Sequence, residues 1–253
     1  MKLALVTGGF RRMGAAIAAR LAMEGWALAL HCRSPKAPEG DLAATLTATG
    51  VDWHGFYADL AHGEALPAML DDVARHFGRP PDLLVNNASA FDYDDAESVT
   101  PALLAHHHAV NAAAPVLLAT ELARHVGEGD QACVVNILDQ RIRHPGGDQL
   151  SYTLSKLTLS AATETLARAL APKVRVNAVA PGLTIPTEEY LPAQMVALEA
   201  AMPLNRLPEP DDIADAVLWL AGAQATTGQT IFVDGGASLK SWDRDFLFLG
   251  RED

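Results

Sequence analysis

Two side chains with complementary acid–base chemistry stand four residues apart in the second half of the chain. Tyr152 and Lys156 belong to a segment of helical period, so they lie on one face of the expected helix. A lysine ammonium beside a phenol stabilises the phenolate and lowers the pKa of the hydroxyl, which would make Tyr152 a proton donor near neutral pH. We therefore expect these two residues to take part in a proton transfer.

A turn that contains glycine directly follows the first apolar run of the chain. It reads Thr7-Gly8-Gly9-Phe10-Arg11-Arg12-Met13-Gly14, and a helical pattern begins at once after it. Glycines permit a tight turn and let a phosphate approach the backbone amides at a helix N-terminus. We therefore expect a dinucleotide cofactor here, held by Gly8, Arg11, Arg12, Met13 and Gly14.

The residues at the end of the second apolar run indicate which dinucleotide binds. An NAD-binding unit normally places an acidic residue there for the ribose 2′-hydroxyl, whereas this chain has Arg33 and Ser34. Arginine can pair with a 2′-phosphate and serine can add a hydrogen bond, so we predict NADPH as the cofactor. Asp59, with Leu60 beside it, follows the third run, where it would either accept from the adenine amine or cap the next helix.

Short apolar runs alternate with segments of helical period along almost the whole chain. Nearly continuous hydrophobicity in the short runs is typical of a parallel sheet covered on both faces. We predict one α/β domain over residues 1–253, a doubly wound Rossmann domain with a seven-stranded, mainly parallel sheet and helices on both faces. The expected strands are 3–7, 26–31, 51–57, 83–86, 133–138, 174–179 and 230–233, and the expected helices are 13–24, 42–49, 65–77, 101–126, 152–170 and 211–221.

The segment 183–210 interrupts this alternation. It contains five prolines around a short helical stretch at 194–201, and it follows the sixth strand. Open α/β sheets bind ligands beyond the carboxyl ends of their strands. We therefore expect this insertion to act as a lid over the substrate.

Composition excludes several classes of partner. The 253 residues carry a formal charge of −12, with a pI near 5.1, which disfavours nucleic acid and anionic membranes. No apolar run has the 18 residues that a membrane helix needs. The two cysteines, Cys32 and Cys133, form no CxxC pair, which indicates a reducing compartment. We expect a cytoplasmic enzyme with a small-molecule substrate.

Taken in order, these motifs resemble the short-chain dehydrogenase/reductase family over about residues 2–237. The similarity rests on the loop 7–14, Asn86-Asn87-Ala88, Asn111, Tyr152 with Lys156, Pro181-Gly182 and Val233-Asp234-Gly235-Gly236. The resemblance implies that Tyr152 donates the proton and that Lys156 binds the nicotinamide ribose. It also implies that Asn111 supports a proton-relay water and that the segment around Asn87 and Ala88 packs by the adenosine. Pro181 and Gly182 would contact the cofactor, and the family's assembly implies a homotetramer.

Two residues depart from the common pattern of that family. Asp139 stands where the catalytic serine is usual, and Arg12 replaces the middle glycine of the loop. A serine hydroxyl donates to a carbonyl oxygen that becomes an alkoxide, whereas an ionised carboxylate only accepts and would repel that oxygen. Asp139 suits a substrate that presents N–H donors, and Arg12 offers donors to phosphate and to the acceptor atoms of a planar heterocycle.

These departures resemble the pteridine reductase branch of the family, including bacterial dihydromonapterin reductases. The resemblance implies that NADPH reduces a C=N bond of a dihydropterin to give a tetrahydropterin, with dihydrofolate as a further candidate. Phe91 would stack the pterin against the nicotinamide, and Ser89 would contact the ligand or the cofactor. The expected catalytic residues are Asp139, Tyr152, Lys156 and Asn111, and the expected substrate contacts are Arg12, Ser89, Phe91, Asp139, Tyr152 and Leu183.

Some alternatives remain open at the level of the sequence. The enzyme could reduce a carbonyl compound or oxidise an alcohol, if Asp139 is protonated and donates, or the chain could bind NADPH as a sensor without turnover. The aromatic residues in 241–253 could reach a neighbouring subunit or cover the active site. The consecutive histidines at 106–108 predict no metal site, because adjacent helical positions diverge by about 100°.

Overall fold

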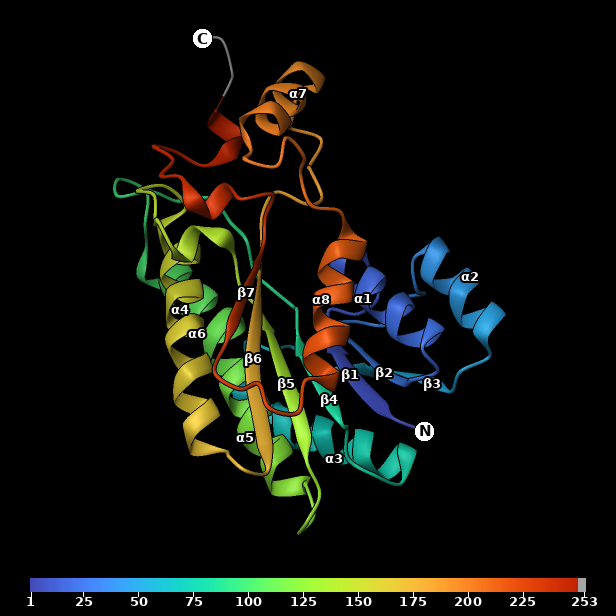
Figure 1. The fold of residues 1–253 in the computed structure, drawn as a ribbon. Coiled ribbons are helices and arrows are strands. Elements are labelled where there is room, and N and C mark those ends of the chain that lie inside the picture. The colour runs from blue at the N-terminus through green and yellow to red at the C-terminus, as the bar shows by residue number, and fades with distance from the viewer. Residues whose placement is uncertain (250–253) are drawn as a thin grey trace.

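Seven parallel strands form one sheet at the centre of the protein (Figure 1). The computed structural model describes residues 1–249. The strand order is β3-β2-β1-β4-β5-β6-β7, and every neighbouring pair is parallel, which confirms the predicted doubly wound sheet. The strands are β1 (Leu3–Thr7), β2 (Ala27–Cys32), β3 (Trp53–Tyr57), β4 (Leu83–Asn86), β5 (Ala132–Ile137), β6 (Val174–Pro181) and β7 (Thr230–Val233).

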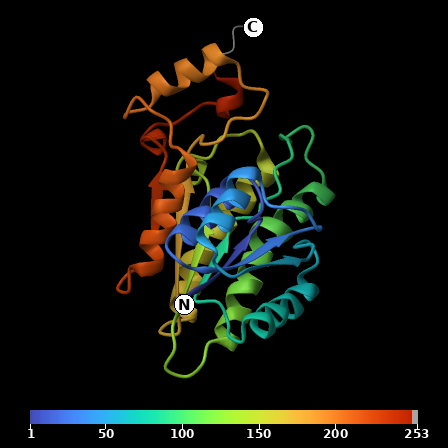
Figure 2. The same cartoon turned by 90° about the vertical axis from the view of Figure 1, so that its right-hand side faces the viewer.

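Helices cover both faces of the sheet (Figures 1 and 2). Because side chains alternate along a strand, Ala4 and Val6 of β1 join the hydrophobic core on one face of the sheet, whereas Leu3 and Leu5 join the core on the other face. In residues 1–249 no helix is long and apolar enough to cross a membrane. One layer contains α1 (Arg12–Met23), α2 (Gly40–Thr49) and α8 (Pro210–Gly222), and the other contains α3 (Leu66–Phe77), α4 (Pro101–His108), α5 (Ala114–His125) and α6 (Leu150–Ala169).

The single helix expected at 101–126 is divided in the structure. A wider π-helical turn, Ala109–Ala113, separates α4 from α5. Pro115 has no N–H to donate to the carbonyl of Asn111, so the regular α-helical hydrogen bond at this point cannot form. The wide turn therefore centres on Asn111, one of the expected catalytic residues.

The insertion and the C-terminal segment pack against each other beyond one end of the sheet (Figures 1 and 2). The insertion contains α7 (Pro192–Ala201), close to the helical stretch expected there. The side-chain amide of Gln194 lies 2.8–3.0 Å from the carbonyl oxygens of Phe246, Leu247 and Leu249. Residues 241–249 thus lie over their own chain, whereas 250–253, also part of the expected tail, lie outside the described residues.

Candidate active site

The turn after β1 closes tightly enough to require glycine. A Cβ on Gly14 would lie 2.1 Å from the carbonyl oxygen of Gly8, which itself has φ +63°. The Asn87 amide donates to the carbonyl of Thr7 at 2.9 Å and holds the segment after β4 against this turn. The close packing leaves the N-terminus of α1 facing the open end of the sheet.

Arg12 adopts a backbone conformation that favours glycine. Its φ is +51°, so the glycine-like geometry of the loop persists although the residue has a side chain. The Arg12 N–H donates to the Glu39 carboxylate at 2.7 Å, and its guanidinium donates to the Ile185 carbonyl at 3.2 Å. Arg12 therefore connects the glycine turn with the insertion.

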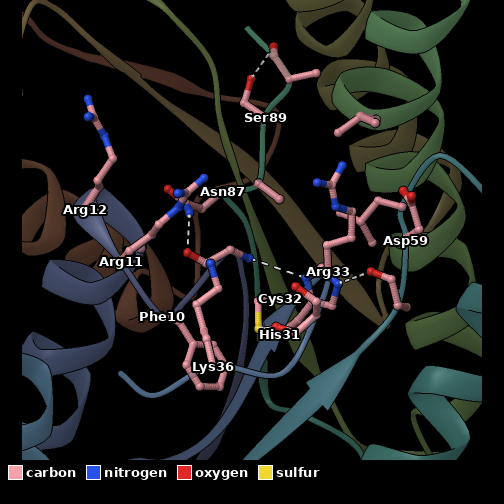
Figure 3. Close-up of a pocket in the computed structure, with 18 of the residues that line it drawn as sticks. Phe10, Arg11, Arg12, His31, Cys32, Arg33, Lys36, Asp59, Asn87 and Ser89 are labelled. Atoms are coloured by element: carbon pink, nitrogen blue, oxygen red, sulfur yellow. Dashed lines mark hydrogen bonds between the residues drawn. The ribbon is translucent and has the colours of Figure 1, made fainter. Parts of the chain in front are cut away.

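A cavity of about 550 Å³ opens at the carboxyl ends of β1, β2 and β4. In Figure 3, Arg12 and Arg33 extend from opposite sides of it. Sequence reasoning missed Phe10, His31 and Lys36, which also line it. Four basic side chains, those of Arg11, Arg12, Arg33 and Lys36, thus border one cavity in a protein of net charge −12, which suits a ligand rich in phosphate. All twelve cofactor residues expected in the first half of the chain line it: Gly8, Arg11, Arg12, Met13, Gly14, Arg33, Ser34, Asp59, Leu60, Asn87, Ala88 and Ser89.

Buried side chains fix the edges of this cavity. His31 lies between the Gly8 amide, 3.4 Å from Nδ1, and the Ala58 carbonyl, 2.9 Å from Nε2, and burial lowers the pKa of its imidazole. Neutral His31 can therefore accept from Gly8 and donate to Ala58. Asp59 accepts from the Ala61 N–H at 3.0 Å and also lines the cavity. The same carboxylate therefore caps a turn and remains beside the cavity.

A second cavity, of about 280 Å³, adjoins the first at the ends of β5 and β6. Its outer wall comes from the insertion and from Asp245, Phe246 and Leu247. Arg12 lines only the first cavity, so the structure does not bring it to the expected substrate contacts except through Ile185, which lines the second. Asn111, an expected catalytic residue, lines neither cavity. The remaining residues expected around the substrate and the nicotinamide line the second cavity: Ser89, Phe91, Asp139, Tyr152, Lys156, Pro181, Gly182 and Leu183.

Tyr152 lines this second cavity. Its hydroxyl donates to Asp139 Oδ2 at 3.0 Å, and its ring meets Phe91 edge to face at 4.6 Å. Lys156 Nζ donates to the Ile137 carbonyl at 2.8 Å and lies 5.5 Å from the centre of the Tyr152 ring.

The protonation equilibria of this group differ from the expectation. Burial and the neighbouring Asp139 raise the pKa of Tyr152 well above 10, so the expected lowering by Lys156 is wrong for this state. Burial lowers the pKa of Lys156 to about 8. Tyr152 therefore keeps its proton at neutral pH, whereas burial disfavours the charged form of Lys156.

Comparisons with known proteins agree with this geometry. A family model described as enoyl-(acyl carrier protein) reductase matches residues 9–238. The chain belongs to the short-chain dehydrogenase/reductase family. One relative, a 3-oxoacyl-[acyl-carrier-protein] reductase of Staphylococcus aureus, is 31% identical over 93% of this chain and 97% of its own.

Two solved structures of this family are more similar in sequence. FolM alternative dihydrofolate reductase 1 from Brucella canis, complexed with NADP, is 37% identical, with a TM-score of 0.87 over 96% of each chain. The protein of the same description from Brucella suis, also in complex with NADP, is 36% identical, with a TM-score of 0.85 over 97% of this chain and 98% of its own.

The Asn111 side chain is fully hydrogen-bonded in this member of the short-chain dehydrogenase/reductase family. The amide oxygen accepts from the Ala90 N–H at 2.7 Å and from Ser89 at 3.2 Å, and the amide nitrogen donates to the Ala90 carbonyl and to Ser155. These four contacts use both donors and both lone pairs of the amide. They fix the segment that carries Ser89 and Phe91, and the expected support of a proton-relay water by Asn111 stays a prediction.

Two charged residues that sequence reasoning did not select lie beside Asp139. The Arg141 guanidinium forms ion pairs with Asp139, at 3.4 Å, and with Asp245, and it lies 5.1 Å from the centre of the Tyr152 ring. Asp245 is 104 residues from Arg141, so no local pattern in the sequence could have joined them. The Asp139 carboxylate therefore faces a cation as well as the phenol.

Asp94, from the acidic run after Phe91, anchors the helix that carries Tyr152. Its buried carboxylate accepts from the Ser151 N–H at 3.0 Å and from the Ser151 hydroxyl, at the first turn of α6. A carboxylate at this position satisfies free N–H groups and interacts favourably with the helix dipole.

The three consecutive histidines point to different surroundings. His107 is buried between the Asp92 N–H and the Leu103 carbonyl, whereas His106 borders the first cavity. Residues 1–249 contain no group of three His, Cys, Asp or Glu side chains that could hold a metal ion.

Proposed function

We propose that this protein is an NADPH-dependent pteridine reductase that reduces a C=N bond of a dihydropterin. One observation carries the proposal: the family's usual hydroxyl donor is replaced by Asp139, 3.0 Å from the Tyr152 hydroxyl in the second cavity. An ionised carboxylate there can accept from the ring N–H and amino groups of a pterin but offers no donor to an alkoxide. The two FolM structures, each with NADP, support this substrate class and this cofactor.

The first cavity fits NADPH in its charge and in its shape. Arg33 and Lys36 are placed to pair with a 2′-phosphate, and Gly8 and Gly14 line the same cavity at the start of α1, where the pyrophosphate would lie. When bound, NADPH supplies the hydride for the reduction. Lys156, which lines the second cavity, would hold the nicotinamide ribose.

The side chains that line the second cavity bind the substrate and transfer the proton. Phe91 offers a ring face to the pterin, and Asp139 accepts its N–H groups. Tyr152 is protonated at neutral pH and supplies the proton to the substrate nitrogen once its hydroxyl turns from Asp139. Lys156, charged below about pH 8, then stabilises the phenolate that remains. The insertion, which contributes Leu183, acts as the lid that excludes water.

A panel of substrates tests the proposal directly. NADPH consumption would be followed with dihydrobiopterin, dihydromonapterin, oxidised biopterin, dihydrofolate and a set of ketones and 3-oxoacyl thioesters. We expect turnover on a dihydropterin and none on the ketones. Turnover on ketones alone would overturn the proposal, and tight NADPH binding without turnover on any compound would indicate a sensor.

A second candidate function is reduction of a 3-oxoacyl or other carbonyl substrate. The family model and the Staphylococcus aureus relative favour it. It requires Asp139 to be protonated so that it can donate to the carbonyl oxygen. Turnover of ketones or 3-oxoacyl thioesters with none of dihydropterins would favour this function.

A further inference from the structure

The surroundings of Asp139 connect the substrate pocket with the C-terminal segment. Asp139 Oδ1 accepts from the Arg141 N–H at 2.9 Å, and the guanidinium of the same arginine pairs with Asp245. Asp245 in turn donates its N–H to the Asp148 carboxylate at 2.7 Å. A line of charged groups thus leads from the reacting phenol to a segment more than a hundred residues away in sequence.

Burial makes this line energetically significant. The side chains of Asp139, Arg141 and Asp245 are only 21%, 11% and 9% exposed. A carboxylate removed from water tends to take up a proton, unless a cation or N–H donors stabilise its charge. Arg141 supplies both to Asp139, as a guanidinium and as a backbone donor.

The charges that face Asp139 come from three elements. Arg141 lies in the short turn after β5, Tyr152 and Lys156 lie on α6, and Asp245 lies in the C-terminal segment. With both carboxylates ionised and both Arg141 and Lys156 protonated, this buried group is neutral. Loss of Arg141 alone would leave two carboxylates facing one lysine.

Arg141 also retains a donor for a ligand. Its Nε is buried and has no hydrogen-bond partner among residues 1–249, although Asp139 is nearby. The other nitrogens are occupied by Thr153, at 3.2 Å, and by Asp245. A buried donor without a partner beside a substrate cavity is costly unless binding satisfies it.

We propose that Arg141 is a positioning residue that keeps Asp139 ionised as an acceptor for the substrate ring and ties it, through Asp245, to the C-terminal wall of the pocket. The identity of the ring rests on the proposed function, whereas the effect of Arg141 on Asp139 does not. Because Asp245 tethers the wall, recognition of the substrate depends on a segment that contributes nothing to the cofactor cavity.

The first test needs no substrate. Carbon-13 NMR of aspartate-labelled enzyme with NADP⁺ bound would follow proton uptake by Asp139, with the signal assigned through Asp139→Asn. In Arg141→Met the uptake should move to higher pH by roughly 1–3 units, whereas Arg141→Lys should restore most of the difference. The control is Arg143→Met, which removes an exposed arginine two residues away. Equal titration in Arg141→Met and Arg143→Met would overturn the proposal.

The second test uses turnover of a dihydropterin. Arg141→Met should shift the acid limb of kcat/KM by the same amount as the NMR titration, with unchanged NADPH affinity as evidence of an intact fold. Asp245→Asn should raise KM for the dihydropterin roughly tenfold, about 1.4 kcal/mol, because the wall loses a charged hydrogen bond. An unchanged KM would overturn the tether. If the wild type reduces no pteridine but the NMR shift follows Arg141, the proposed function fails and the role of Arg141 stands.

Discussion

The carboxylate at position 139 decides which kind of atom can be held beside Tyr152. A serine at this place would donate to an oxygen, whereas Asp139 accepts from the phenol at 3.0 Å and from any N–H donor that enters the cavity. The neighbouring Arg141 pairs with the same carboxylate. We therefore propose that substrate choice depends mainly on Asp139 and on its ion pair with Arg141.

Replacing this carboxylate should separate substrate chemistry from cofactor binding. We expect Asp139→Ser to lower kcat/KM for a dihydropterin by roughly a hundredfold or more, because the ring loses its charged acceptor. NADPH affinity should stay within about twofold, since Asp139 lies outside the first cavity. Steady-state kinetics and a fluorescence titration with NADPH measure the two effects. Unchanged pterin turnover would contradict the assignment.

The lysine next to the phenol predicts an alkaline limit to activity. Burial lowers the pKa of Lys156 to about 8, whereas that of Tyr152 lies well above 10. As pH rises through about 8, Lys156 loses its charge first, so the phenolate formed in the reaction loses its stabilising cation. We expect kcat/KM to fall by about tenfold per unit above this pH. A pH profile without this limb up to pH 10 would contradict the role of Lys156.

The arginine at the end of β2 predicts the preference for NADPH. Removing it in Arg33→Ala should weaken NADPH binding by roughly ten- to a hundredfold and leave NADH binding nearly unchanged, because only NADPH carries the 2′-phosphate. Dissociation constants for both cofactors in both proteins test this. Equal losses for the two cofactors would show that Arg33 only shapes the loop.

At the scale of elements, the sequence predicted the strands closely because β1, β2, β4, β5 and β6 are apolar runs that are buried along their whole length. β1, β4 and β7 begin and end at the expected residues. The sequence does not reveal the π-helical turn, because Pro115 fits the continuous apolar pattern of the helix expected at 101–126. Asp139, Tyr152 and the glycine loop could be recognised from spacing, whereas Arg141 and Asp245 meet only through tertiary packing.

The helix that carries Tyr152 depends on a carboxylate from another segment. Asp94→Asn should lower the free energy of unfolding by about 1–2 kcal/mol and Tm by roughly 3–6 °C, because the first turn of α6 loses a charged acceptor. Asp92→Asn is the matched control, since the Asp92 side chain is largely exposed. Thermal unfolding of both variants measures the difference, and equal Tm values would argue against this anchor.

At the scale of the whole molecule, the helices α4, α5 and α6 carry exposed leucines, namely Leu104, Leu117 and Leu154. An apolar surface of this kind is typical of subunit contacts, and we expect a homotetramer. Light scattering after size exclusion should show a smaller species for Leu117→Glu. The same change at Val196, an exposed residue of α7, should leave the assembly intact. A monomeric wild type would contradict this prediction.

The left-handed backbone at Arg12 lowers thermal stability, but the arginine side chain makes a contact with the insertion that glycine could not make. A side chain at φ +51° costs on the order of 1–2 kcal/mol that glycine would avoid, so selection for heat resistance alone would favour glycine at this position. That exchange would also remove the guanidinium that links the glycine turn to Ile185. An engineering campaign that ranks variants by melting temperature would therefore enrich a protein that holds its cofactor loop well and its insertion poorly.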